Sequence, residues 1–215
     1  MKYDLVIFDL DGTLLDTIYD LMDSVNEVLV KYNYPKIDLK KAYANIGYGA
    51  TNFIKSSLKD ESLYQDTMLE EFNICYKRLY KNKAKIYPNI NKLLNYLKDN
   101  NIKIAINTNK DHQYALELAK DRFSNYNIDK VIGNGYGLPI KPDPSGVNEI
   151  IDYYKIEKSK VLFIGDSEAD IKTANNAIVD SVFVSWGYRT YLEVKDTNPT
   201  YQVDDALEII EIIKG

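Results

Sequence analysis

Short apolar runs alternate with helix-type patterns along most of the chain. Runs typical of buried strands, each followed by a polar or glycine-bearing turn, lie at residues 3–8, 102–106, 160–164 and 181–185, with a weaker one at 130–132. Apolar residues recur at the spacing of one helix face over residues 90–97, 115–119, 147–154 and 207–213. This alternation predicts an α/β fold built on a doubly wound, mostly parallel sheet of five strands.

Residues 15–82 break the alternation. They contain helix patterns at residues 51–58 and 69–80 but no convincing strand. An apolar stripe precedes these helices and consists of Leu15, Ile18, Leu21, Met22, Val25 and Leu29. We therefore expect an all-helical cap, residues 15–82, inserted into a catalytic core made of residues 1–14 and 83–215.

The composition limits the classes of function. The chain has 215 residues and a net charge of -5 without a basic cluster, so we expect neither nucleic acid nor a membrane as a partner. A single cysteine, Cys75, cannot form an internal disulfide, and no signal peptide or long apolar segment is evident, so we expect a cytoplasmic protein. With His112 as the only histidine, carboxylates must carry any catalysis.

Two aspartates follow the first predicted strand, in the sequence Asp9-Leu10-Asp11-Gly12-Thr13. Ligands of open parallel sheets bind at the carboxyl ends of the strands, and alternate residues there can point to the same site. Two unpaired carboxylates would repel each other, which favours a hard divalent cation between them. Alternatively, the segment is a solvated turn that happens to be acidic.

A second acidic group follows the strand predicted at residues 160–164. Asp166 would stand at the end of that strand and complete an octahedral site with Asp9, while Asp170, one helical turn later, would hold a metal-bound water. The same residues also suit the capped start of a helix, with Asp166 or Ser167 as the cap. The two interpretations are compatible.

Two further groups suit phosphate recognition. Lys141 is followed by two prolines, Pro142 and Pro144, which restrict the backbone and can direct the ammonium group towards the ends of the strands. Thr108 and Asn109 end the strand predicted at residues 102–106 with a hydroxyl and an amide, groups that can hold phosphate oxygens. The alternatives are a surface lysine and simple helix capping.

In this order, each after a predicted strand, the four groups resemble the motifs of the haloacid dehalogenase superfamily of phosphohydrolases. Residues 9–13 are similar to the first motif, Thr108 to the second, Lys141 to the third, and Asp166 with Asp170 to the fourth. The resemblance covers nearly the whole chain. It implies a Rossmann-like core with an inserted α-helical cap of the family's first type.

Other segments are similar to the phosphoglycolate phosphatase relatives within that superfamily. They are residues 16–17, 47–49 and 185–189. The chain departs from the common pattern at Asp111, where relatives often have proline, and at Ile178, where they often have glycine. Neither position is catalytic in the family.

The resemblance implies a Mg²⁺-dependent phosphatase that works through an aspartyl phosphate. Asp9 would attack phosphorus, and Asp11 would protonate the leaving oxygen and later take a proton from water. Mg²⁺ would be held by the Asp9 side chain, the backbone carbonyl of Asp11 and Asp166, with Asp170 supporting the site. Lys141 would cancel negative charge.

The remaining implied site residues bind the substrate, a small phosphorylated metabolite. The Thr108 side chain and the backbone N–H groups of Leu10, Asp11 and Asn109 would hold the transferring oxygens. In the cap, we expect substrate contacts from Thr17, from Gly47 and Gly49, which let the backbone approach a small ligand, and from Lys55, which would pair with a carboxylate. A solvated helix lysine is the alternative for Lys55.

Three other functions remain open from the sequence. The same fold supports a pyrophosphatase and a sugar phosphate mutase related to β-phosphoglucomutase, although Thr13 after Gly12 favours hydrolysis. A non-catalytic protein that binds a phosphorylated metabolite is the third, but the chain has kept every motif residue. We expect a monomer or a homodimer.

Overall fold

The computed structural model describes residues 1–215, which form two compact units. The first unit, the core, consists of Met1–Leu15 and Ile86–Gly215, and the second, the helical unit, consists of Asp16–Lys85. A two-stranded sheet of β2 (Leu15–Asp16) and β3 (Lys85–Ile86) lies where the chain leaves the core and returns to it. None of the helices has both the length and the apolar character that crossing a bilayer requires.

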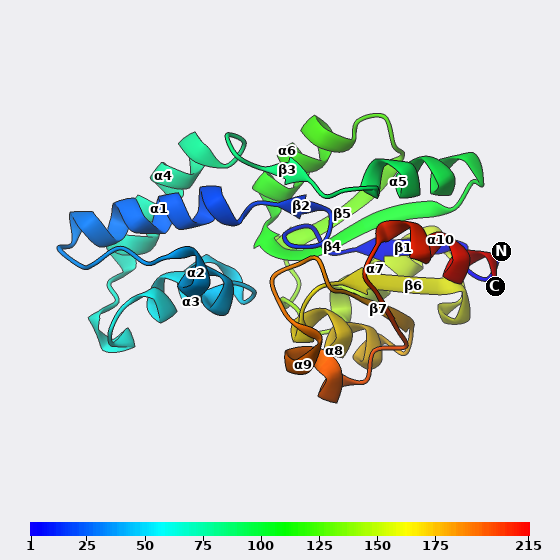
Figure 1. Ribbon diagram of the computed structural model, residues 1–215. Coiled ribbons are helices and arrows are strands. Elements are labelled where there is room, and N and C mark those ends of the chain that lie inside the picture. Colours follow the sequence, from blue (N-terminus) through cyan, green and yellow to red (C-terminus); the bar gives the residue numbers. More distant parts are fainter. The chain divides into compact units, whose positions relative to one another are not determined.

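The core is built on a six-stranded sheet whose neighbouring strands all run parallel (Figure 1). In spatial order the strands are β5 (Ile128–Asn134), β4 (Lys103–Asp111), β1 (Leu5–Phe8), β6 (Val161–Gly165), β7 (Asp180–Val184) and β8 (Tyr201–Val203). The predicted α/β class with a parallel sheet is therefore confirmed. The expectation of five strands is wrong by one, because the three residues of β8 are too few to show a strand pattern and only Val203 among them is buried.

Helices cover both faces of this sheet, as its apolar strands require. All four residues of β1 are buried, and the apolar core around Leu5 and Ile7 includes Phe163 of β6 and Val147 of α7. Figure 1 shows α5 and α6 on one side of the sheet and α8 on the other. The helices of the core are α5 (Ile90–Asp99), α6 (His112–Phe123), α7 (Ser145–Tyr154), α8 (Glu168–Ala177), α9 (Tyr191–Val194) and α10 (Ala206–Lys214), with short 3₁₀ turns at Lys158–Lys160 and Lys195–Thr197.

The helical unit contains α1 (Ile18–Lys31), α2 (Leu39–Asn45), α3 (Gly49–Ser57) and α4 (Asp66–Leu79), with a 3₁₀ turn at Glu61–Leu63. Its interior holds an aromatic series in which Phe72 meets Phe53 edge-on and stacks on Tyr76. The sequence pattern gave no indication of α2, since only Ala42 of its seven residues is buried. Leu15, which we assigned to the first helical stripe, lies in β2 instead.

Asp20 fixes the end of the helical unit. Its buried carboxylate accepts hydrogen bonds from the backbone N–H groups of Lys83 and Ala84, each at 3.0 Å. Desolvation raises the pKa of Asp20, and these hydrogen bonds lower it in part. The first turn of α1 is thereby tied to the segment that returns to the core.

Candidate active site

The acidic motifs meet at the carboxyl ends of β1 and β6, which are neighbours at the centre of the sheet. Asp9 directly follows β1, and its backbone N–H donates to the carbonyl of Ile164 in β6 at 2.9 Å. Asp166 follows β6, and Asp170 lies in the first turn of α8. Adjacent parallel strands end at the same edge of a sheet, so this topology brings residues 9 and 166 together although they are far apart in sequence.

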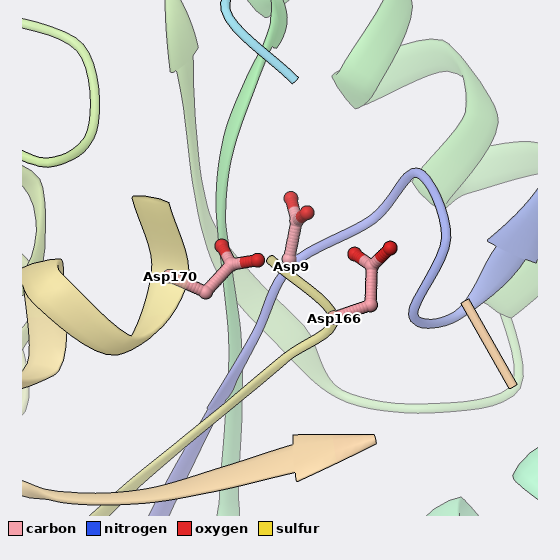
Figure 2. Close-up of side chains that lie close together, drawn as sticks. All are labelled: Asp9, Asp166 and Asp170. Carbon is pink, nitrogen blue, oxygen red and sulfur yellow. The ribbon is translucent and has the colours of Figure 1, made fainter. Parts of the chain in front are cut away.

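The carboxylates of Asp9, Asp166 and Asp170 form one buried cluster (Figure 2). One oxygen from each lies within 4.8 Å of the others. Burial raises the pKa of Asp9 to about 6, an effect that Lys141 opposes and Asp170 reinforces. Burial also raises the pKa of Asp166 well above its ordinary value, and the charges of Asp170 and Asp9 raise it further. Three crowded oxygen donors with this much unfavourable charge suit a hard divalent cation.

Lys141 places a buried ammonium group within this cluster. Its Nζ lies 2.8 Å from Asp9 Oδ1 and 2.5 Å from Asp170 Oδ1, and only 3% of the side chain is exposed. Burial lowers the pKa of Lys141, but Asp170 and Asp9 outweigh that effect and raise it above the ordinary value. The surface-lysine alternative is therefore wrong, and the ammonium stays charged beside Asp9.

Asn109 holds the segment that carries Lys141. Its side-chain Oδ1 accepts from the backbone N–H of Lys141 at 2.8 Å, and its Nδ2 donates to the carbonyl of the same residue at 3.1 Å. This double hydrogen bond ties the end of β4 to the Lys141 loop. The Asn109 side chain therefore supports Lys141, while its expected substrate contact is through the backbone.

Asp170 has two partners in the structure, the start of α8 and Lys141. Ser167 is the N-cap of α8, and its backbone N–H and hydroxyl both donate to Asp170 Oδ2, at 2.9 and 2.6 Å. The other oxygen of Asp170 pairs with Lys141. Since protein donors engage both oxygens, Asp170 is best suited to hold Lys141 in place next to the metal ligands.

The carboxylate of Asp166 is held by residues to which we assigned no role from the sequence. The Thr13 hydroxyl donates to Asp166 Oδ1 at 3.3 Å, and the backbone N–H of Tyr188 donates to Oδ2 at 2.6 Å. The Trp186 indole donates to the carbonyl of Thr13 at 3.1 Å. Residues 185–189 entered the sequence analysis only as a family similarity, and a turn after β7 carries no signal of which carboxylate its N–H will reach.

Asp11 lies outside the three-carboxylate cluster. Its Oδ1 and Oδ2 are each 3.0 Å from Nζ of Lys110, a side chain that is 3% exposed. The sequence pattern did not indicate Lys110 as a site residue. The available signal was strand alternation, because Lys110 and Thr108 are two positions apart in β4 and so share a face.

Thr108 and Leu10 are both buried at the end of the sheet. The Thr108 Oγ1 accepts from the backbone N–H of Lys110 at 3.3 Å, which orients its hydroxyl proton away from that bond. The carbonyl of Leu10 accepts from Leu14 and Leu15 and thereby closes the turn that carries Asp11. The turn requires Gly12, whose φ of 90° is unfavourable for any residue with a side chain.

The four candidates expected in the cap lie in the helical unit. Thr17 is buried at the N-terminus of α1, Gly49 begins α3, and Gly47 and Gly49 have φ values of 128° and 83°. The Lys55 ammonium lies 4.9 Å from the centre of the Tyr64 ring and is thus engaged within its own unit.

The comparisons with known proteins agree with this geometry. Residues 6–184, most of the chain and all of the core motifs, match the family model described as haloacid dehalogenase-like hydrolase. The chain belongs to this family. The resemblance inferred from the four motifs is confirmed, and the relatives of this haloacid dehalogenase-like hydrolase narrow the class further.

Curated phosphoglycolate phosphatases are similar to the chain over its full length. The proteins of that name from Haemophilus influenzae (strain 86-028NP) and Psychrobacter arcticus are each 30% identical, over 99% of this chain and 99% and 96% of theirs. A solved structure from Lactobacillus delbrueckii subsp. bulgaricus, provisionally named phosphoglycolate phosphatase, superposes with a TM-score of 0.91 at 26% identity and covers 99% of both chains.

A more distant hydrolase shows that the fold extends beyond these relatives. The haloacid dehalogenase-like protein from Streptococcus pneumoniae superposes with a TM-score of 0.83 at 20% identity, over 98% of both chains. With the family and the full-length relatives together, this hydrolase is a phosphatase of phosphoric monoesters that acts on a small phosphorylated substrate. Phosphatases of the family generally use a divalent metal, and the buried aspartates supply ligands for one.

Proposed function

We propose that this phosphatase hydrolyses a small phosphate monoester of the phosphoglycolate type, with Mg²⁺ as cofactor and Asp9 as nucleophile. The observation that carries the proposal is the buried Asp9 carboxylate. It lies 2.8 Å from the Lys141 ammonium, at the carboxyl ends of the parallel strands. A carboxylate can approach an anionic phosphate only where positive charge reduces their repulsion. Lys141 supplies such charge at the nucleophile itself.

The reaction would proceed in two displacements. In the first, an Asp9 oxygen bonds to phosphorus as the ester P–O bond breaks, and Asp11 gives its proton to the leaving oxygen. In the second, Asp11 takes a proton from a water that attacks the same phosphorus. The bond from phosphorus to Asp9 then breaks, which releases inorganic phosphate and restores both aspartates.

Mg²⁺ would be held by the carboxylates of Asp9 and Asp166 and the backbone carbonyl of Asp11. The fit rests on the clustered oxygens and on Asp166, whose position Thr13 and Tyr188 fix. When bound, Mg²⁺ neutralises phosphoryl charge in the ground state and the transition state. Asp170 keeps Lys141 directed at Asp9 through the pair at 2.5 Å.

The transferring oxygens would be bound by Thr108 and by backbone N–H groups. Thr108 accepts from the Lys110 N–H and therefore has its own proton to donate. The N–H groups of Leu10, Asp11 and Asn109 belong to the same two strand ends and would bind the remaining oxygens. Thr108 and Asn109 lie in β4, and Leu10 and Asp11 lie in the turn closed by the Leu10 carbonyl, so these donors should need little reorganisation during the reaction.

We also propose that the helical insertion, residues 15–82, acts as a cap that selects the part of the substrate beyond the phosphate. The carboxylate of a phosphoglycolate-type substrate would pair with Lys55, and Gly47, Gly49 and Thr17 would border the same ligand. The relatives named phosphoglycolate phosphatase support this substrate class. The positive φ values of the two glycines show that the backbone at both positions favours glycine.

The test is Mg²⁺-dependent phosphate release from a substrate panel by the wild type and by Asp9→Asn. The panel contains 2-phosphoglycolate, an alkyl phosphate without a carboxylate, p-nitrophenyl phosphate, pyrophosphate and a hexose bisphosphate. We expect 2-phosphoglycolate to have the highest kcat/KM and Asp9→Asn to release no phosphate from any compound. A preference for pyrophosphate, or for the bisphosphate as an activator, would replace the proposal with a pyrophosphatase or a mutase.

A further inference from the structure

Lys110 holds the carboxylate of Asp11 by both oxygens. The Nζ atom is 3.0 Å from Oδ1 and 3.0 Å from Oδ2, and the lysine side chain is 3% exposed compared with 14% for Asp11. Buried lysines are rare unless they are paired, and the two equal distances place the ammonium between the two oxygens of one carboxyl group. This contact restricts the position of the Asp11 carboxyl group.

The backbone at Lys110 lies beside β5. β4 continues through Asp111, which pairs with Asn134 at the end of β5. Gly133 of β5 lies so close that a Cβ there would be 2.7 Å from the carbonyl oxygen of Lys110. Since β5 pairs with β4 on both sides of Lys110, at Asn107 and Asp111, and packs against the Lys110 carbonyl, Lys110 presents its ammonium from an ordered strand end.

The buried cations divide the acidic groups into two sets. Lys141 pairs with Asp9 and Asp170, whereas Lys110 pairs with Asp11. Asp11 is only two residues from Asp9, but its side chain is not part of the cluster that could hold a metal. A carboxylate this close to a metal site would compete as a ligand unless another contact held it elsewhere.

We propose that Lys110 is the positioning residue for Asp11: it holds the carboxyl group apart from the metal ligands and in place for proton transfer. The inference rests on the proposed function, in which Asp11 exchanges protons with the leaving oxygen and with water. A general acid or base works only within hydrogen-bond reach of its partner, and a displacement of about 1 Å can cost on the order of 100-fold in rate. Lys110 itself does not contact the reacting atoms in this account.

The test compares Lys110→Met with Asp11→Asn on three substrates that depend differently on proton transfer. Ethyl phosphate and 2-phosphoglycolate have poor alkoxide leaving groups, and only the latter has a carboxylate. p-Nitrophenyl phosphate has a good leaving group that needs little protonation. The parameter kcat/KM reports the steps up to release of the alcohol, so Asp11→Asn should lose far more activity on the two alkyl esters than on the aryl ester.

Lys110→Met should reproduce this pattern. We expect kcat/KM to fall by about 10- to 100-fold for both alkyl esters and by less than about threefold for p-nitrophenyl phosphate. The double variant should be no worse than Asp11→Asn alone, because both changes affect the same proton transfer. The matched control is Lys130→Met, which removes a half-buried lysine of β5 that pairs with Glu149 of α7 and should leave kcat/KM for all three substrates unchanged.

Two results would overturn the inference while leaving the proposed function intact. A loss confined to 2-phosphoglycolate would show that Lys110 binds the substrate carboxylate. Equal losses on all three substrates, or none, would show a structural role or no role. If the wild type releases phosphate from none of the three substrates, the proposed function fails first, and the inference fails with it.

Discussion

Gly187 packs directly against the side chain of Asp166. A Cβ at position 187 would lie 2.2 Å from Asp166 Cβ and 2.5 Å from its Oδ2, and a Cβ at Gly12 would lie 2.4 Å from the same Oδ2. Two glycines on separate loops therefore leave the space that this carboxylate occupies. The position of Asp166, the proposed metal ligand, therefore depends both on its hydrogen bonds and on the absence of side chains at Gly187 and Gly12.

Gly187→Ala should displace Asp166 and weaken metal binding. We expect a loss of about 1 to 3 kcal/mol in the free energy of unfolding, because a methyl group is forced into filled space. The Mg²⁺ concentration for half-maximal activity should rise at least about tenfold. Thermal unfolding and a Mg²⁺ titration of phosphate release measure the two effects.

Gly135→Ala is the control. Nothing lies within 4 Å of a Cβ at that position, so any loss of stability there comes from backbone strain alone. An unchanged Mg²⁺ requirement in Gly187→Ala would contradict the account.

Ile178 has an unfavourable backbone conformation, and its side chain is not buried. It lies just after α8 with φ 60° and ψ 53°, and 78% of the side chain is exposed. A β-branched residue is strained in this left-handed region, which glycine adopts freely. Ile178→Gly should raise the free energy of unfolding by about 1 kcal/mol and leave kcat/KM unchanged, as measured by urea denaturation. Ile178→Ala should gain less, and a destabilised glycine variant would show that the exposed side chain makes a contribution we have missed.

The raised pKa values in the carboxylate cluster predict how the metal-free protein responds to pH. A carboxyl group whose pKa is higher in the folded state binds protons more tightly there, so its contribution to stability is largest at low pH and is lost as the pH rises through the folded value. For Asp9 this window runs from about pH 4 to about 6, and Asp166 shifts in the same direction. In a chelator, Asp166→Asn should therefore become more stable than the wild type as the pH rises from 5 to 8.

Addition of Mg²⁺ should reverse this order. A cation that binds only the folded wild type raises its unfolding temperature, while Asp166→Asn has lost a ligand and should respond weakly. Lys141 does not affect the comparison of the two proteins between pH 5 and 8. Its pKa is raised above the ordinary lysine value, so it stays protonated over this range. Thermal unfolding of both proteins, with chelator and with Mg²⁺, gives the four curves. Equal responses of the two proteins to Mg²⁺ would argue against Asp166 as a ligand.

The hydrogen bonds of the Asp20 carboxylate should stabilise the helical unit. Asp20→Ala leaves the buried N–H groups of Lys83 and Ala84 without their acceptor, and we expect a loss of about 2 kcal/mol in the free energy of unfolding. Asp23→Ala is a matched control in the same helix, since the Asp23 pair with Lys83 is exposed and should contribute less than about 1 kcal/mol. Equal losses in the two variants would contradict this assignment.

The sequence predicted those parts of the site that follow from strand order. Asp9 and Asp166 each follow an apolar strand, and parallel strands end at one edge of the sheet, so their proximity was foreseeable. The pairing of Asp11 with Lys110 could not be foreseen, because it depends on the direction of one lysine side chain at the carboxyl end of β4. The contact of Tyr188 with Asp166 depends on the path of a loop, and loops carry no periodic signal.

Short elements escaped the prediction for a related reason. β8 has three residues and α2 has one buried residue, so neither shows a period. Leu15 continued the apolar spacing of α1 but pairs in β2, where the chain leaves the core. In each case, contacts with distant segments decide the local structure, and the spacing of nearby residues does not report them.

The central claim is that Asp9 becomes phosphorylated, and a chemical trap tests it most directly. The wild-type enzyme is mixed with 2-phosphoglycolate and Mg²⁺, quenched in acid during turnover and reduced with borohydride, which converts an aspartyl phosphate to homoserine. Peptide mass spectrometry then locates the modified residue, with Asp9→Asn as the control. The account predicts homoserine at position 9 in the wild type and none in the variant. Steady phosphate release with unmodified Asp9, or modification at another aspartate, would contradict it.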